Sequence, residues 1–194
     1  SRAEADALPE RQQHDPEGDA VPREGVERVV GDEANQEAHD DEHDFAASMA
    51  RMLALEPSEL DSTDTADHAI EALRASSIRN VVLSARRGPE HAAFTSPELR
   101  ELPKLEHTNV VMNRADIEAA IVRAGEAPEK DVKSNLEAML LIAENPKNEH
   151  ERTMEFLFQH TPKEILGTDR VEGVVYSTPD GDITIKCGLV ITAI

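Results

Sequence analysis

Apolar residues recur with helical spacing through the middle of the chain. Phe45, Met49, Met52 and Leu53 lie at positions i, i+4, i+7 and i+8, which predicts a helix over residues 45–55 with Asp44 as its N-cap. Pro57 ends that helix. The same reasoning predicts a helix capped by Asp64 and further helices over 97–102, 116–124 and 132–143. Short apolar runs at 78–84 and 110–112 predict strands between them.

The period of the apolar pattern changes to two after Asn145-Pro146. Met154, Phe156 and Phe158 alternate with Glu155 and Leu157, as in a strand with one buried face. Further strands are predicted over 171–176 and around 183–185, joined by a hairpin turn at 179–182. The run 189–194 has the continuous apolar character of a buried strand. The pattern therefore predicts an α/β fold: a Rossmann-like, three-layer unit followed by a C-terminal antiparallel β-meander.

Residues 1–44 differ in composition from the rest of the chain. They hold fifteen acidic residues, four arginines and three prolines, and such a segment buries too little apolar surface to offset its chain entropy. We expect an extended acidic arm over 1–44, within which residues 26–30 are compatible with a short strand. The folded domain is predicted over 45–194.

The net charge of the chain limits the kinds of molecule that it can bind. The net charge is −20, from 40 acidic and 20 basic residues, which opposes binding to nucleic acid or to anionic membrane surfaces and favours a basic protein partner. The single cysteine excludes an internal disulfide, and no run of 18 apolar residues could insert into a bilayer. We therefore expect protein partners, no nucleic acid and no direct membrane insertion.

Two adjacent arginines carry the clearest chemical signal. Arg86 and Arg87 follow the apolar run 78–84 and precede Gly88-Pro89. In a dinucleotide-binding βαβ unit, the adenosine ribose lies at the end of the second strand. Because guanidinium groups bind phosphate in a planar, bidentate manner, arginines at this position favour NADP over NAD.

The sequence around these arginines resembles the NADP-binding domain of adrenodoxin-type ferredoxin–NADP reductases. The resemblance is carried by Arg86-Arg87-Gly88-Pro89, Ala93-Phe94-Thr95 and Glu98-Leu99-Arg100-Glu101, and a weaker match covers residues 152–194. It implies that Arg86 and Arg87 hold the 2′-phosphate and that Glu98 contacts NADP. It also implies that the helix at 45–55 follows a glycine-rich phosphate loop.

Three departures from that family pattern indicate lost activity. No glycine occurs between Gly31 and Gly88, and carboxylates at 40, 41, 42 and 44 precede the helix where the diphosphate of NADP would lie. No FAD domain is recognisable, and the chain stops where the family would return to the flavin. These departures predict a degenerate domain without cofactor or metal: a non-catalytic accessory subunit of a larger complex. By resemblance, that complex would be mitochondrial, such as a respiratory complex or ATP synthase.

Other functions remain open at this stage. The chain could be the NADPH-binding fragment of a split or truncated ferredoxin–NADP reductase, still using Arg86, Arg87 and Glu98. It could also be a sensor that binds only the adenosine 2′,5′-bisphosphate end of the nucleotide. His39 and His43, with the acids between them, have the i, i+4 spacing of a divalent metal site, although a solvated acidic turn is the simpler interpretation.

Overall fold

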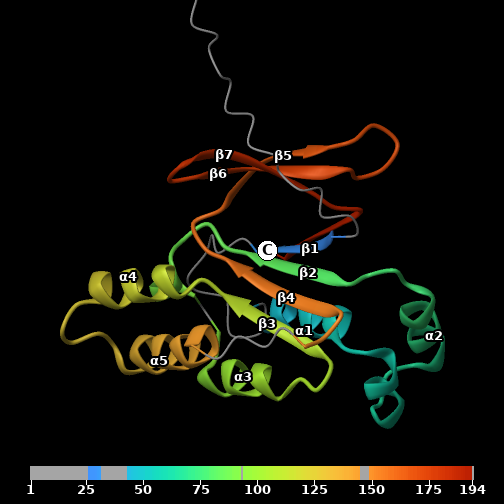
Figure 1. Ribbon diagram of the computed structural model, residues 1–194, viewed down its shortest axis with the longest axis horizontal. Coiled ribbons are helices and arrows are strands. Elements are labelled where there is room, and N and C mark those ends of the chain that lie inside the picture. Colours follow the sequence, from blue (N-terminus) through green and yellow to red (C-terminus); the bar gives the residue numbers. More distant parts are fainter. Residues whose placement is uncertain (1–25, 32–42, 93, 145–148, 194) are drawn as a thin grey trace, which may run out of the picture.

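A computed structural model describes residues 26–31, 43–92, 94–144 and 149–193 of the chain. These residues form three layers, which Figure 1 shows from the side: helices, a parallel sheet, and a smaller antiparallel sheet on the face opposite the helices. The α/β class, the parallel sheet and the C-terminal meander predicted from sequence are therefore confirmed.

The central sheet has five strands in the order β3-β4-β2-β1-β8, and all neighbours are parallel. The short strand considered for residues 26–30 of the acidic arm is present as β1. It lies between β2 and β8 and is therefore part of the fold. The rest of the arm lies outside the described residues. The strands are β1 (Val26–Gly31), β2 (Asn80–Ser84), β3 (Thr108–Met112), β4 (Arg152–Leu157) and β8 (Leu189–Ala193).

Helices α1, α3 and α5 cover one face of this sheet, and α4 packs beside α5 (Figure 1). Helix α2 lies near the start of β2, beyond the edge of the helical layer. Its cap differs from the prediction, because Ala66 rather than Asp64 precedes the first turn. The helices are α1 (His43–Ala54), α2 (Asp67–Ala75), α3 (Ser96–Glu101), α4 (Arg114–Ala124) and α5 (Lys130–Glu144); short 3₁₀ turns are η1 (Pro57–Ser62), η2 (Pro89–His91) and η3 (Leu102–Lys104).

The antiparallel sheet comprises β5 (Thr161–Leu166), β6 (Gly173–Thr178) and β7 (Gly181–Lys186), in that order. The predicted hairpin joins β6 to β7, and Gly181 adopts a φ of 122° in its turn, a conformation that favours glycine. One prediction was wrong here: residues 154–158 were assigned to the meander, but β4 is a parallel strand between β3 and β2. The first meander strand is β5, which the sequence did not indicate.

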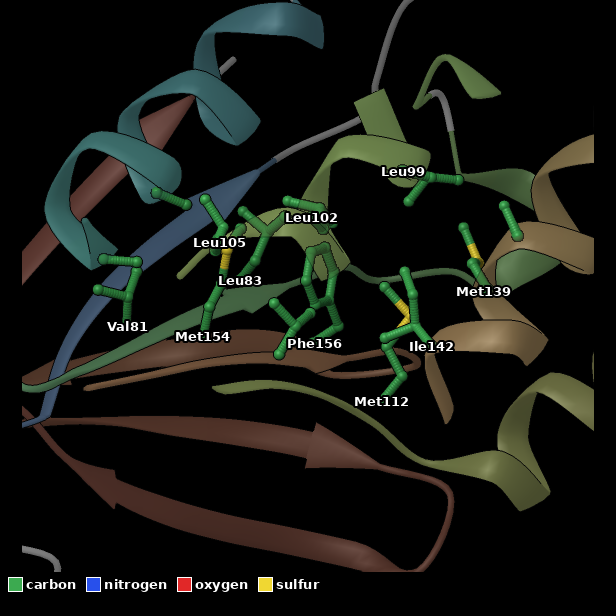
Figure 2. Packing of buried hydrophobic residues seen from close by; sticks show 14 of the residues in the cluster. Val81, Leu83, Leu99, Leu102, Leu105, Met112, Met139, Ile142, Met154 and Phe156 are labelled. Carbon is green, nitrogen blue, oxygen red and sulfur yellow. The ribbon is translucent and has the colours of Figure 1, made fainter. Parts of the chain in front are cut away.

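The main hydrophobic core lies between the parallel sheet and the helices (Figure 2). Val81 and Leu83 of β2 and Met154 and Phe156 of β4 point into it from the sheet, and residues of α3, η3 and α5 meet them. A second, smaller cluster of Val174, Tyr176 and Cys187 lies within the meander. The Ser84 hydroxyl donates to the Tyr176 hydroxyl at 3.3 Å, so a buried polar contact joins the two sheets.

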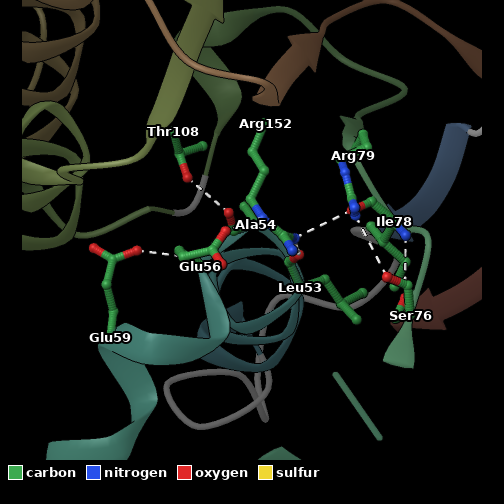
Figure 3. Close-up of polar contacts among 9 residues, drawn as sticks. All are labelled: Leu53, Ala54, Glu56, Glu59, Ser76, Ile78, Arg79, Thr108 and Arg152. Carbon is green, nitrogen blue, oxygen red and sulfur yellow. Dashed lines mark hydrogen bonds and ion pairs between the residues drawn. The ribbon is translucent and has the colours of Figure 1, made fainter. Parts of the chain in front are cut away.

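A buried arginine fixes the amino-terminal ends of β2 and β4 (Figure 3). Arg152 donates to the Glu56 carboxylate at 3.0 Å and to the carbonyls of Ile78 and Leu53 at 3.1 and 3.4 Å. Thr108 at the start of β3 donates to the Ala54 carbonyl at 2.6 Å. These contacts satisfy carbonyls that would otherwise be left unpaired where α1 ends.

Candidate nucleotide-binding site

The carboxyl end of β2 positions the two adjacent arginines. Ser84, the last residue of β2, pairs with Val30 of β1 and Leu157 of β4. The hydrogen bonding continues beyond the strands: Ala85 donates to the Leu157 carbonyl at 2.8 Å, and His160 donates back to the Ala85 carbonyl at 2.9 Å. The backbone that carries Arg86 and Arg87 is therefore held at the edge of the sheet where ligands bind in open α/β folds.

A further backbone contact fixes Arg87 itself. The amide of Gln159 donates to the Arg87 carbonyl at 3.1 Å. Gln159 has a φ of 57°, the left-handed conformation that few residues other than glycine adopt. This turn directs the chain from β4 toward β5, so that the antiparallel sheet reaches the same edge.

A pocket of about 410 Å³ opens at this edge. Part of its lining comes from the segment after β2 and from the last turn of α4, and the rest comes from the turn after β4 and from the antiparallel sheet. We call Arg86, Arg87 and Arg123 the basic wall, beside which Glu90 and His91 also line the pocket, and we call Gln159, Thr161, Ser177 and Thr178 the hydroxyl wall.

Arg123 forms a two-pronged ion pair with Glu90 at the basic wall. Its Nε donates to Glu90 Oε1 at 2.5 Å, and its Nη2 donates to Oε2 at 3.0 Å. The pair packs on the Gly88 backbone, since a Cβ at residue 88 would overlap the Glu90 carboxylate and lie 2.8 Å from Arg123 Nη2. A side chain at residue 88 would therefore displace the ends of the Glu90 and Arg123 side chains.

The electrostatic state of Glu90 follows from that contact. Burial acts to raise the pKa of the Glu90 carboxyl, but hydrogen bonds from Arg123 and from its own backbone amide, with the charges of Arg123 and His91, lower it overall. The side chain of Glu90 is 10% exposed, whereas that of Arg123 is 40% exposed. Glu90 is therefore an ionised carboxylate covered by Arg123.

Glu98 is not among the residues that line the pocket with the two arginines. It occupies the first turn of α3. Its Oε2 accepts hydrogen bonds from the Thr95 amide at 2.9 Å and the Thr95 hydroxyl at 2.8 Å, and the two residues form a capping box. The structure thus brings Arg86 and Arg87 together at the pocket, while Glu98 supports the helix start; its predicted contact with NADP stays a prediction.

The chemistry of the pocket suits a phosphorylated sugar. Guanidinium groups form strong, charge-assisted hydrogen bonds to phosphate oxygens, and hydroxyl and amide groups can both donate to and accept from sugar hydroxyls. Arg123 and the hydroxyl wall were missed by the sequence reasoning. The only signal for Arg123 was a basic residue in the last turn of a helix, which does not reveal what that helix packs against.

The amino-terminal edge of the sheet holds a second pocket, of about 580 Å³. Two of the arginines that line it are already paired, Arg74 with Asp61 and Arg152 with Glu56. His107 and His150 meet there edge to face, with ring centroids 6.1 Å apart. Because ligands of open α/β sheets bind at the opposite edge, the pocket beside Arg86 and Arg87 is the better candidate for a nucleotide site.

The described part of the chain shows neither a group of side chains that could hold a metal ion nor a helix that could cross a membrane. No group of three or more metal-ligating side chains occurs in residues 43–92, 94–144 and 149–193 that could hold a metal ion. The possible metal site at His39 and His43 stays untested, because the structure describes neither the placement of His39 nor the side chain of His43. No helix among the described residues is long and apolar enough to cross a membrane.

Comparison with known proteins gives a consistent set of relatives. No protein-family model matches the chain. NADPH-ferredoxin reductase FprA of Mycobacterium tuberculosis is 39% identical over 130 residues, which cover 67% of this chain and 28% of that protein. The mitochondrial NADPH:adrenodoxin oxidoreductase of Arabidopsis thaliana is 32% identical over 137 residues, which cover 67% of this chain and 28% of that protein.

Structural comparison agrees with the sequence matches. The structure of M. tuberculosis FprA in complex with NADPH matches with a TM-score of 0.75 and 31% identity, and the match covers 88% of this chain and 39% of that one. The chain therefore spans well under half the length of these relatives. The relatives include both mycobacterial and mitochondrial proteins, so the predicted mitochondrial location stays a prediction.

These findings overturn two predictions. The accessory-subunit function is wrong, because the relatives are named as reductases and none of them points to a structural role. The prediction of no cofactor is also wrong, because the relatives use NADPH and one matching structure contains it. Both predictions gave most weight to the carboxylates at 40–44. Three of these lie outside the described residues, whereas the described pocket is rich in arginine.

Proposed function

We propose that this chain, which is homologous to the NADP-binding domain of adrenodoxin-type ferredoxin–NADP reductases, is the NADPH-binding part of such a reductase. The observation that carries the proposal is the pocket at the carboxyl end of β2, which Arg86 and Arg87 line together with residues that carry hydroxyl and amide groups. An NADPH 2′-phosphate at the two guanidinium groups would place the adenosine ribose beside the hydroxyl wall.

The residues of the pocket account for a preference for NADPH over NADH. NADH carries a hydroxyl where NADPH carries a phosphate, so only NADPH would gain charge-assisted hydrogen bonds from Arg86 and Arg87. The backbone at these arginines is fixed by hydrogen bonds to Gln159 and His160. Because the backbone is already fixed, phosphate binding would need ordering of the arginine side chains alone.

Reduction of ferredoxin is proposed only for a full-length protein that contains this chain. NADPH supplies a hydride when bound, and a flavin is the acceptor in the family that the sequence resembles. The residues described here bind and orient the nucleotide end that carries no redox chemistry. We expect this chain alone to bind NADPH without oxidising it.

Calorimetric titration of the chain with NADPH and NADH tests the proposal. We expect tighter binding of NADPH, and we expect Arg86→Ala to weaken NADPH binding by about 10- to 100-fold, which corresponds to one lost hydrogen bond between charged groups. NADH binding should be little changed. Arg74→Ala is the matched control, because Arg74 also carries an ion pair but lies at the opposite edge of the sheet. Equal affinity for the two nucleotides in the unmodified chain would refute the proposal.

A further inference from the structure

A carboxylate lies at the proposed 2′-phosphate pocket, where its charge should oppose the ligand. Glu90 lines this pocket only three residues after Arg87, and its lowered pKa keeps it ionised at neutral pH. Like charges repel one another, and they do so more strongly where the protein displaces water. An exposed Glu90 would therefore offset part of the attraction that Arg86 and Arg87 provide.

Arg123 is placed to cancel this charge. Two of its nitrogens face the two oxygens of Glu90, at 2.5 and 3.0 Å, so the carboxylate is occupied on both sides. Arg123 comes from α4, which packs against η2, and it also lines the pocket. His91 adds a weaker partner, with its Nε2 lying 3.9 Å from Glu90 Oε1.

The position of the ion pair links it to the phosphate-binding backbone. The pair packs on Gly88, the residue that follows Arg87, and Glu90 is 10% exposed. Arg123 also interacts with the charge of Asp116 on the same helix. The basic wall therefore contains a third arginine whose charge is already committed to local acids.

We propose that Arg123 is a positioning residue for nucleotide specificity: by neutralising Glu90, it preserves the positive potential that Arg86 and Arg87 present to a 2′-phosphate. This inference rests on the proposed NADPH binding and adds to it the origin of the discrimination. In this proposal Arg123 acts through Glu90, whose two oxygens engage its Nε and Nη2, rather than by contact with the phosphate.

Titration with two adenosine probes tests this role. The probes are 2′,5′-ADP, which carries the 2′-phosphate, and 5′-AMP, which does not. In Arg123→Gln, the uncompensated Glu90 charge should weaken 2′,5′-ADP binding about tenfold and leave 5′-AMP binding within about twofold. Arg114→Gln is the matched control on the same helix, since Arg114 pairs with Glu118 and Glu144 away from the pocket.

Two further variants separate charge neutralisation from direct contact. The double variant Glu90→Gln/Arg123→Gln should recover the affinity of the unmodified chain for 2′,5′-ADP to within about threefold. Glu90→Gln alone should bind this probe as tightly as the unmodified chain or more tightly, because Arg123 then adds uncompensated positive charge. A double variant as weak as Arg123→Gln, or weaker binding by Glu90→Gln, would overturn the inference.

The titrations also distinguish this inference from the proposed function. If the unmodified chain binds 2′,5′-ADP no more tightly than 5′-AMP, the assignment of the 2′-phosphate pocket fails. If the unmodified chain prefers 2′,5′-ADP and Arg123→Gln keeps that preference in full, only the role of Arg123 fails. Unfolding curves in urea, measured for each variant, establish that the titrated protein is folded.

Discussion

Glu90 illustrates how a buried charge depends on its partner. Burial is the largest single effect on the pKa of this carboxyl and raises it, but the hydrogen bonds from Arg123 and from the Glu90 backbone amide, together with the charges of Arg123 and His91, lower it overall. A folded-state pKa below the unfolded value means that ionised Glu90 stabilises the fold above about pH 4.5. This stabilisation is lost as the pH falls through the folded-state pKa, when the carboxyl takes up a proton.

Because the folded-state pKa of Glu90 is lowered, the stability of the Glu90→Gln variant relative to the unmodified chain should depend on pH. Near neutral pH we expect the variant to be less stable by about 0.5–1 kcal/mol, a modest value because Arg123 is partly exposed and the pair is screened. The difference should shrink as the pH falls below about 4.5 and through the lowered folded-state pKa of Glu90. Urea unfolding at a series of pH values measures it, and a difference that does not vary with pH would contradict the assignment.

Arg152 gives a second prediction at the level of a single residue. Its side chain is 9% exposed and donates to Glu56 and to the carbonyls of Leu53 and Ile78. Arg152→Met should lower the free energy of unfolding by about 1–3 kcal/mol, since the Leu53 carbonyl loses the donor that Arg152 supplies. The Ile78 carbonyl keeps the donor that Arg79 supplies, and the half-exposed Glu56 can return to water.

Arg79 provides the control for this variant. It also donates to the Ile78 carbonyl, at 2.8 Å, but from an exposed position (Figure 3). Arg79→Met should therefore change the free energy of unfolding by less than about 0.5 kcal/mol. Urea unfolding of both variants makes the comparison, and equal losses would show that burial of Arg152 is not what makes it important.

At the scale of elements, Glu98 in the first turn of α3 has two roles to test: capping of the helix, and the contact with NADP that the family resemblance implies. Its carboxylate accepts from the amide and hydroxyl of Thr95, and we expect Glu98→Ala to destabilise the chain by about 1 kcal/mol through loss of the cap. Glu98→Gln should be nearly neutral, because glutamine also completes a capping box. Thermal unfolding measures both effects.

The same two variants test the contact with NADP implied by the family resemblance. If Glu98 acts only on the helix start, NADPH affinity should be unchanged in Glu98→Gln once the protein is folded. A loss of affinity in Glu98→Gln, with stability maintained, would instead place the carboxylate charge at the nucleotide. Calorimetric titration under the conditions used for the unmodified chain distinguishes these results.

Helices were predictable from sequence because each buries one face. Met139 and Ile142 of α5 lie in the core, at the spacing that the helical period requires. β4 was assigned to the wrong sheet because its burial alternates: Met154 and Phe156 face the helices and are buried, while Thr153 and Glu155 are half-buried. Such alternation is typical of antiparallel strands. β5 had no pattern to detect, because five of its six residues are exposed.

The candidate site was predictable only where it is local in sequence. Arg86 and Arg87 follow directly from the end of a strand, and one rule of α/β folds places them at the ligand-binding edge. Arg123 and Thr178 line the same pocket although they are distant from Arg86 and Arg87 in sequence. Arg123 does so because α4 packs against η2, and Thr178 does so because β6 of the antiparallel sheet ends there. Contacts of this kind depend on tertiary structure, which no local pattern of a single sequence specifies.

For the whole molecule, the pocket spans the junction of two hydrophobic clusters. Its basic wall comes from the end of β2 and from α4, which belong to the main core, and its hydroxyl wall includes Ser177 and Thr178 of β6. Tyr176 of the second cluster is hydrogen bonded by Ser84 and contacts His160 edge to face, with ring centroids 5.9 Å apart. A ligand that touches both walls should therefore hold the two sheets together.

The rate at which the single cysteine reacts with a thiol reagent measures whether a bound ligand holds the two sheets together. Cys187 is 5% exposed and lies in the second cluster beside Val174 and Tyr176, so a thiol reagent can reach it only when that cluster opens. At 2′,5′-ADP concentrations about 100 times the Kd, labelling should slow by about 100-fold if opening requires release of the ligand. If Arg86→Ala weakens binding of the probe by about 10- to 100-fold, its labelling should slow only about 2- to 11-fold at the same concentration. Unchanged labelling of the unmodified chain at saturating ligand would show that the antiparallel sheet opens independently of the nucleotide site.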